Sequence, residues 1–195
     1  MGLDLSELDI PPALRVWHRL GLTLFLEAKS PEAEVGQAYG TGSCAGLPEL
    51  WRRIVQEHPA PCATLWTYWQ LTSDLGSEAS SDRIQLFRNI RKALGWASTD
   101  IVFWPLAEQR ASGLHCRSEC FWQGLAVFDP RFVLIFGRQA FKRLFPSTGE
   151  RRYGQFIQDH ISYIFLPGPE DMLPDQKEAK RLVWNTLKAI QLPSM

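Results

Sequence analysis

The sequence carries no net charge. Lysine and arginine together account for 21 of the 195 residues, and aspartate and glutamate account for another 21, so the formal net charge at pH 7 is zero. A whole-molecule attraction to nucleic acid is therefore absent, and any direct contact with DNA would be weak and local.

Long hydrophobic stretches are also missing. Apolar runs such as residues 132–136 are a handful of residues long, well below the roughly 20 that a membrane-spanning helix needs. Residues 1–9 are acidic and lack the basic region and apolar stretch of a secretory signal. We therefore expect a cytoplasmic protein with no membrane partner.

Cysteine and histidine are scarce, at four residues each. The cysteines are Cys44, Cys62, Cys116 and Cys120. In a cytoplasmic protein we expect them to be reduced thiols. His115, Cys116 and Cys120 have a spacing that a metal could use, but a structural zinc site needs a second short-spaced pair, and the other two cysteines are far apart. We therefore expect no metal and no cofactor.

The chain divides into three parts by its pattern. Residues 1–30 contain apolar side chains at helical spacing and predict an amphipathic segment. Residues 31–47 are rich in glycine, serine and alanine without periodicity and predict a flexible linker or loop. Residues 48–195 predict one folded domain. The apolar side chains of the first segment that could bind a partner are Leu14, Trp17, Leu20, Leu22 and Phe25.

Strand and helix signals alternate through the predicted domain. The predicted strands are residues 63–69, 100–104, 132–136 and 162–166, and the predicted helices are a short one ending near His58, then 82–94, 118–127, one after Gly137 and 176–190. Ser80 or Ser81 can cap the second helix and Gly95 can end it. This alternation predicts an α/β fold, a three-layer α/β/α sandwich with a mainly parallel sheet of about four strands.

Ligand sites in such folds lie where the carboxyl ends of the strands open into loops. We therefore examine residues 70–80, 105–113 and 167–175. Asp74 lies in the first loop, and Glu170 with Asp171 in the last. The alternative is that these are solvated loop carboxylates. A basic group on the second helix, formed by Arg83, Arg88, Arg91 and Lys92, is either an outward helix face or a local phosphate-contacting patch.

The order of these signals resembles the uracil-DNA glycosylase superfamily. The resemblance covers about two thirds of the chain, including residues 129–145 (a proline, an apolar strand, then Gly-x-x-Ala) and the closing helix with Lys180, Arg181 and Trp184. It implies a glycosylase-like fold. The superfamily flips uracil out of DNA and cleaves its glycosidic bond.

The catalytic positions that this resemblance implies are largely missing. The family uses a polar residue in the first loop for the attacking water, an asparagine after the second strand to read uracil, and a histidine in the last loop. Here the second position reads WPLAE, and the last loop reads LPGP without a histidine. Asp74 is the one weak candidate for the water, and losing an oxyanion donor costs about 3 kcal/mol of transition-state stabilisation. We therefore expect no efficient glycosylase activity.

A non-catalytic branch matches better. Residues 14–25, LRVWHRLGLTLF, are similar to the N-terminal peptide of the psi-subunit family of the bacterial clamp-loader assembly. That resemblance implies an N-terminal peptide that docks on the clamp loader and a body that binds the small chi subunit. This chain departs from the family by being longer, with the extra unit 129–145.

The leading hypothesis is therefore a non-enzymatic adaptor in DNA replication or repair, which docks through its N-terminal segment. The alternative is a divergent uracil-DNA glycosylase that uses Asp74 or Glu170. A third possibility is that the N-terminal segment packs onto its own domain.

Overall fold

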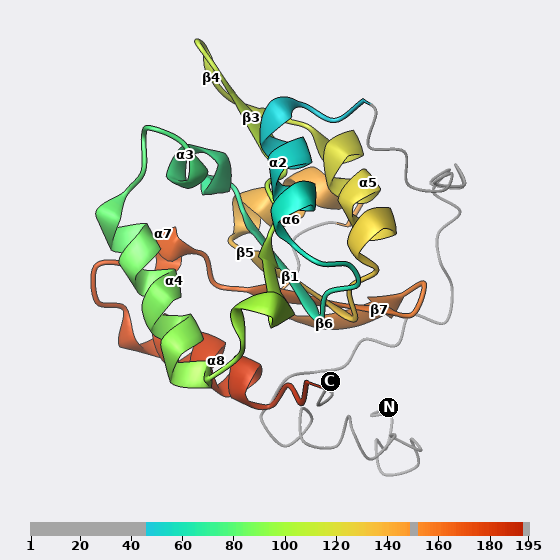
Figure 1. Cartoon of the computed structure of the whole chain (residues 1–195). Coiled ribbons are helices and arrows are strands. Elements are labelled where there is room, and N and C mark those ends of the chain that lie inside the picture. The colour runs from blue at the N-terminus through green and yellow to red at the C-terminus, as the bar shows by residue number, and fades with distance from the viewer. Residues whose placement is uncertain (1–45, 149–151, 193–195) are drawn as a thin grey trace.

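The computed structural model describes residues 46–148 and 152–192. Its centre is a five-stranded sheet with the order β2-β1-β5-β7-β6 (Figure 1). The strands are β1 (Thr64–Tyr68), β2 (Ile101–Phe103), β5 (Phe132–Phe136), β6 (Gly154–Gln158) and β7 (Ile161–Leu166). The first four in this order run parallel, and β6 pairs antiparallel with β7. The predicted amphipathic segment 1–30, with the five residues expected to bind a partner, lies outside the described residues.

The central strands are apolar on both faces because helices cover both. In β5, Val133 and Ile135 pack into one core, while Leu134 and Phe136 pack into the other. The same alternation places Leu65 of β1 on one side and Trp66 on the other. An uninterrupted apolar strand is typical of this situation, since successive side chains point to opposite faces.

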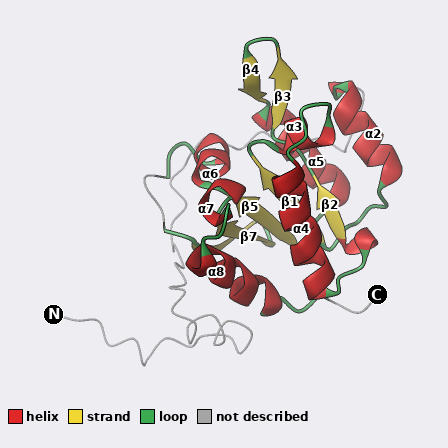
Figure 2. Cartoon of the chain, turned by 90° about the vertical axis from the view of Figure 1, so that its left-hand side faces the viewer, coloured by secondary structure: helices red, strands yellow, loops and turns green. Residues whose placement is uncertain are grey.

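Helices form the two outer layers. The helices are α2 (Glu49–Glu57), α3 (Leu71–Leu75), α4 (Ser81–Leu94), α5 (Ser118–Phe128), α6 (Arg138–Leu144), α7 (Pro169–Met172) and α8 (Lys177–Lys188), with a 3-10 turn, η3 (Ser98–Asp100). Side chains of α2, α5 and α6 fill one core, and those of α4, α7 and α8 fill the other, which faces the viewer in Figure 2. The predicted α/β class with a mainly parallel sheet is confirmed.

Helix α4 begins and ends where its sequence predicts. The Ser80 side chain accepts a hydrogen bond from the Arg83 backbone N–H at 3.5 Å, which is the N-cap arrangement. Gly95 follows the helix with φ of 68°, a left-handed conformation that glycine adopts without strain.

Four predictions about secondary structure are wrong. The sheet has five strands rather than about four, because β6 was missed. The expected loop 70–80 contains α3, and the expected loop 167–175 contains α7. A hairpin of β3 (Ala107–Arg110) and β4 (Gly113–Cys116) projects from the body after β2, where a loop was expected (Figure 1). These elements are short and largely polar, so they carry no clear periodic signal, and their pairing partners determine them. Leu47, one residue before the predicted start of the domain, is buried in the core.

Candidate functional site

The carboxyl ends of β1, β5 and β7 lie at one edge of the sheet, where the predicted site was placed. Tyr68 ends β1, and α3 follows it directly. Gly137 follows β5, and α7, which contains Glu170 and Asp171, follows β7. The three strands are aligned in register, so their last residues are neighbours.

Asp74 is held by a complete set of hydrogen bonds. Its Oδ1 accepts from the Ser80 N–H at 2.9 Å and from Arg83 Nη2 at 2.7 Å. Its Oδ2 accepts from the Tyr68 hydroxyl at 2.8 Å and from Arg83 Nε at 2.8 Å. A carboxylate has about four lone-pair positions, and all four are used here. The side chain is 2 % exposed, so no free oxygen remains to activate a water molecule.

The partners of Asp74 were not predicted from the sequence. Tyr68 is the last residue of β1, and burial, followed by the charge and hydrogen bond of Asp74, raises the pKa of its hydroxyl. The hydrogen bond from Arg83 to Asp74 raises the pKa of that guanidinium. Both donors therefore stay protonated, and the network is fixed over the physiological pH range. The available signal was Arg83 in the first turn of the predicted helix, where it can reach back to the preceding loop.

Glu170 lies at the same edge in a different environment. A Cβ at either Gly137 or Gly168 would collide with its carboxylate, so the two glycines make room for this group. Gly137 also has φ of 91°, which other residues rarely adopt. Burial raises the pKa of Glu170 although the residue as a whole reaches solvent, and nearby Arg83 opposes this rise.

Asp171 accepts a backbone hydrogen bond at the start of its own helix, α7. Its Oδ2 accepts from the Gly168 N–H at 2.9 Å and from the Tyr153 hydroxyl at 2.7 Å. Burial, followed by this hydrogen bond, raises the pKa of Tyr153 to about 12. Asp171 therefore holds the first turn of α7 to Gly168 and links it to Tyr153, the residue just before β6.

The segment after β2 is closed by a tryptophan. Trp104 is fully buried, and its Nε1 donates to the Cys120 carbonyl at 3.3 Å. Gly124 of α5 lies flat against the indole, and a Cβ there would overlap it. The carbonyl of the next residue, Pro105, accepts a hydrogen bond from Trp51 Nε1 at 2.9 Å, which holds the backbone of Pro105 in place as well. Pro167, at the end of β7, is also buried.

A hollow of about 260 Å³ opens between α3 and α4, over the edge of the sheet formed by β1 and β2. Its walls and floor are largely apolar, and we call it the α3–α4 hollow. The lining residues are Tyr68, Leu71, Asp74, Leu75, Ile84, Phe87, Arg88, Arg91 and Phe103. The Tyr68 and Phe87 rings are stacked with their centroids 4.6 Å apart. Sequence reasoning missed this hollow because packing between elements creates it.

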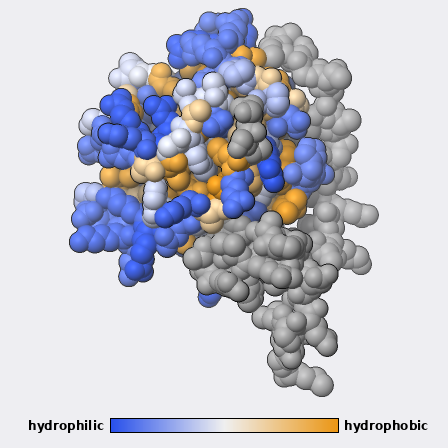
Figure 3. Space-filling view, turned by 60° about the horizontal axis from the view of Figure 1, so that its bottom comes forward, coloured by the Kyte–Doolittle hydropathy of each residue, from blue (hydrophilic) through white to orange (hydrophobic). Residues whose placement is uncertain are grey.

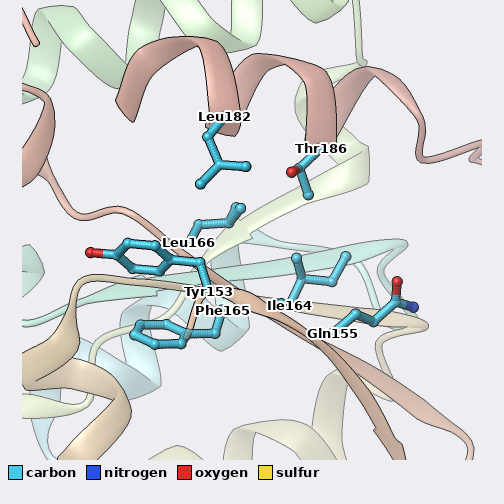
Figure 4. Close-up of a pocket in the computed structure, with 8 residues that line it drawn as sticks. Tyr153, Gln155, Ile164, Phe165, Leu166, Leu182 and Thr186 are labelled. Carbon is cyan, nitrogen blue, oxygen red and sulfur yellow. The ribbon is translucent and has the colours of Figure 1, made fainter. Parts of the chain in front are cut away.

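A second cavity lies beneath α8, against β6 and β7 (Figure 4). It measures about 10 Å³, which is room for about one water molecule and too small for a substrate. Two polar atoms here, Gln155 Oε1 and Thr186 Oγ1, have no hydrogen-bond partner. This cavity is an imperfection of the core rather than a ligand site.

The arginines of α6 and α4 differ in their surroundings. On α6, Arg138 lies over the Tyr153 ring at 5.6 Å and Arg143 over the Trp69 ring at 5.3 Å. On α4, Arg88 and Arg91 are exposed and make no hydrogen bond or ion pair with any described residue. Charge on α4 is therefore available for a binding partner.

The cysteines in the described part of the chain are unpaired thiols. Burial raises the pKa of Cys62 to about 12, and burial raises the pKa of Cys116 and Cys120 as well, so these thiols are not activated nucleophiles. His115 is bound to Ser112, 2.6 Å away, rather than to a cysteine. Within residues 46–148 and 152–192, no three metal-binding side chains gather into a cluster.

The remaining surface of the described chain is mixed. On the face in Figure 3, which lies at the bottom of Figure 1, apolar residues show between polar ones. None of the helices described reaches the length and hydrophobicity that crossing a membrane requires.

Comparison with known proteins finds no family model that matches the chain and no matching curated protein.

Proposed function

We propose that the chain is a non-enzymatic adaptor of DNA replication or repair, built on a glycosylase-like α/β/α body and acting in the cytoplasm. The resemblance of residues 14–25 to the psi-subunit peptide motivates the setting. The observation that carries the non-enzymatic part is the Asp74 network. The carboxylate best placed to position a water molecule has all its lone pairs engaged and is almost completely buried.

The other two loops at this edge support the same conclusion. Trp104 occupies the position after β2 where the resemblance implies an asparagine that reads uracil, and its indole is packed against Gly124. After β7, the buried Pro167 and Gly168 stand where a catalytic histidine is implied. A pocket that lacks both the base reader and the leaving-group donor loses most of its transition-state stabilisation.

A uracil-excision assay tests the non-enzymatic part. The protein is incubated with single-stranded DNA that contains one uracil, and abasic sites are cleaved with alkali and counted. We expect no product above a protein-free control for the wild type or for Asp74→Asn. Product from the wild type that disappears in Asp74→Asn, while that variant remains folded, would overturn the proposal.

A pulldown tests the adaptor part. The full chain and a chain without residues 1–30 are compared for recovery of clamp-loader and DNA-repair proteins. We expect recovery to fall by more than about tenfold without these residues, because Leu14, Trp17 and Leu20 would form the apolar side of the docking peptide. Equal recovery by both chains would contradict docking through the N-terminal segment.

A divergent glycosylase remains the second candidate because of one observation at Glu170. Its carboxyl group lies at the carboxyl edge of the sheet with its pKa raised by burial, as a general acid requires. Uracil excision that is lost in Glu170→Gln and kept in Asp74→Asn would favour this alternative.

A further inference from the structure

We propose that the α3–α4 hollow is a docking site for an acidic peptide segment of a partner protein, which inserts one large apolar side chain and places its carboxylates on Arg88 and Arg91. This inference deepens the proposed adaptor function and rests on it. It assigns a second binding surface, in the folded body and separate from the N-terminal segment.

The shape and lining of the hollow fit a large apolar side chain. Leu71, Phe87 and the Tyr68 ring are almost fully buried and form a floor set by two strands and two helices. Ile84 and Leu75 are half-buried and stand at the walls. An open volume of about 260 Å³ accepts a large aromatic or aliphatic side chain with part of its backbone.

The charges around the hollow favour a partner with carboxylates. Asp74 is the one acidic lining residue, and its charge is balanced by the Arg83 guanidinium. Arg88 and Arg91 are one turn apart on α4 and have no carboxylate partner among the described residues. Other arginines differ, since Arg52 and Arg53 on α2 form ion pairs with Glu49 and Glu57. Among the described residues, no carboxylate compensates these two positive charges on the rim.

The hydrogen-bonding capacity of the lining decides between a peptide and a nucleotide. A base inserted into the hollow would need partners for its polar edge, because a buried polar group without one costs free energy. Asp74 has no free lone pair, and the Tyr68 hydroxyl already donates its proton. The remaining donors are the rim arginines. An apolar side chain needs no such partner, so the lining favours an apolar anchor with acidic neighbours.

Peptide selection on the full-length protein tests this inference. A displayed library of random peptides is selected on the wild type and, in parallel, on Arg88→Glu/Arg91→Glu. The matched control is Arg52→Glu/Arg53→Glu, which makes the same change of charge on α2. We expect the wild type and the control to enrich peptides in which a large apolar residue is flanked by aspartate or glutamate, and the α4 variant to lose that enrichment.

Direct binding then measures the effect. A fluorescein-labelled selected peptide is titrated with each protein, beside a version with the apolar residue changed to alanine and a labelled 12-nucleotide oligothymidylate. We expect the α4 charge reversal and the alanine peptide each to weaken binding by at least about tenfold, and the α2 control to change it less than about twofold.

Several results would overturn the inference. A consensus without acidic residues, or binding unaffected by the α4 variant, would remove the site. Oligothymidylate that binds through Arg88 and Arg91, without peptide binding, would make the hollow a nucleic-acid site. A dimer that dissociates in the α4 variant would assign the surface to a second copy of the chain. Each of these leaves the uracil-excision result unchanged, so failure here is separate from failure of the proposed function.

Discussion

The two faces of the sheet are packed differently. Between the sheet and α5, Trp104 and Gly124 fit with no room for an additional methyl group. Between the sheet and α4, aromatic residues such as Trp66, Phe87 and Phe103 pack edge to face, but the layer ends in the open α3–α4 hollow. The same strands support both faces, so the difference comes from the helices.

This difference separates stability from function in the molecule. A closely packed face stabilises the fold, and adding a single methyl group at a close contact such as Gly124–Trp104 is costly. An open hollow, whose two rim arginines have no ion-pair partner in the described part of the chain, contributes little to stability, so a role in binding explains it better. The four predictions below test that separation in order of expected effect.

The largest effect is expected from two neighbouring residues that point to opposite faces. Trp104→Ala removes a fully buried indole and its hydrogen bond to Cys120, and should lower the free energy of unfolding by about 4 kcal/mol. Phe103→Ala removes a half-buried ring at the hollow and should cost about 1–2 kcal/mol. Urea denaturation measures both variants. Equal losses would show that the faces do not differ.

The second effect concerns the polar network beside the hollow. Asp74→Asn keeps the shape but removes the charge that compensates Arg83, so we expect a loss of about 2–3 kcal/mol in urea denaturation. Arg83 is 24 % exposed, which keeps the loss below that of a fully buried pair. Asp82→Asn, an exposed change on α4, is the control and should cost less than about 1 kcal/mol. A similar small loss for Asp74→Asn would mean that the network does not hold α3 to α4.

Features that neighbouring residues determine could be predicted from the sequence, and features that depend on contacts between elements could not. The local sequence determines the strand at 132–136 and the caps of α4, and the predictions for these elements match the structure. Strand β6 has the polar residues Gln155 and Gln158 and acquires its place only by pairing with β7. The position of Asp74 at the strand edge was predictable from the loop that contains it.

The state of Asp74 was not predictable. Its burial depends on Tyr68, Ser80 and Arg83 meeting across three elements, which no local pattern encodes. The α3–α4 hollow likewise exists only because α3 folds where a loop was expected. Interactions between elements therefore decide the chemistry of this site, while local sequence decides the regular elements such as β5 and α4.

The third prediction tests the closed face through pH. The pKa of Cys62 is raised by burial from 9.0 to about 12, so the folded protein holds this proton above pH 9 while the unfolded chain releases it. Stability must then fall as pH rises from about 9 to 12, by up to about 1.4 kcal/mol per pH unit from this group. Cys62→Ala should lose stability less steeply over pH 9–11 than the wild type in urea denaturation.

The control for the pH series is Cys116→Ala. Burial raises the pKa of Cys116 as well, but this residue is half-buried where Cys62 is buried, so this variant should change the slope less. Parallel slopes for the wild type and Cys62→Ala would show that water reaches the Cys62 thiol, and that the face covered by α2 and α5 is more open than its packing indicates.

The smallest effect on stability is expected inside the hollow itself. Ile84→Trp places a larger ring toward the open volume of about 260 Å³, so we expect the free energy of unfolding to change by less than about 1 kcal/mol. The matched change on the closed face is Gly124→Ala, a much smaller addition that meets the Trp104 indole and should cost about 1–3 kcal/mol. Thermal and urea denaturation compare the two. If the tryptophan destabilises the protein more than the added methyl group does, then the hollow is part of the packed core and cannot be a docking site. If it does not, Ile84→Trp becomes a folded variant with a filled hollow, in which binding of an acidic peptide should be lost while α4 keeps both arginines.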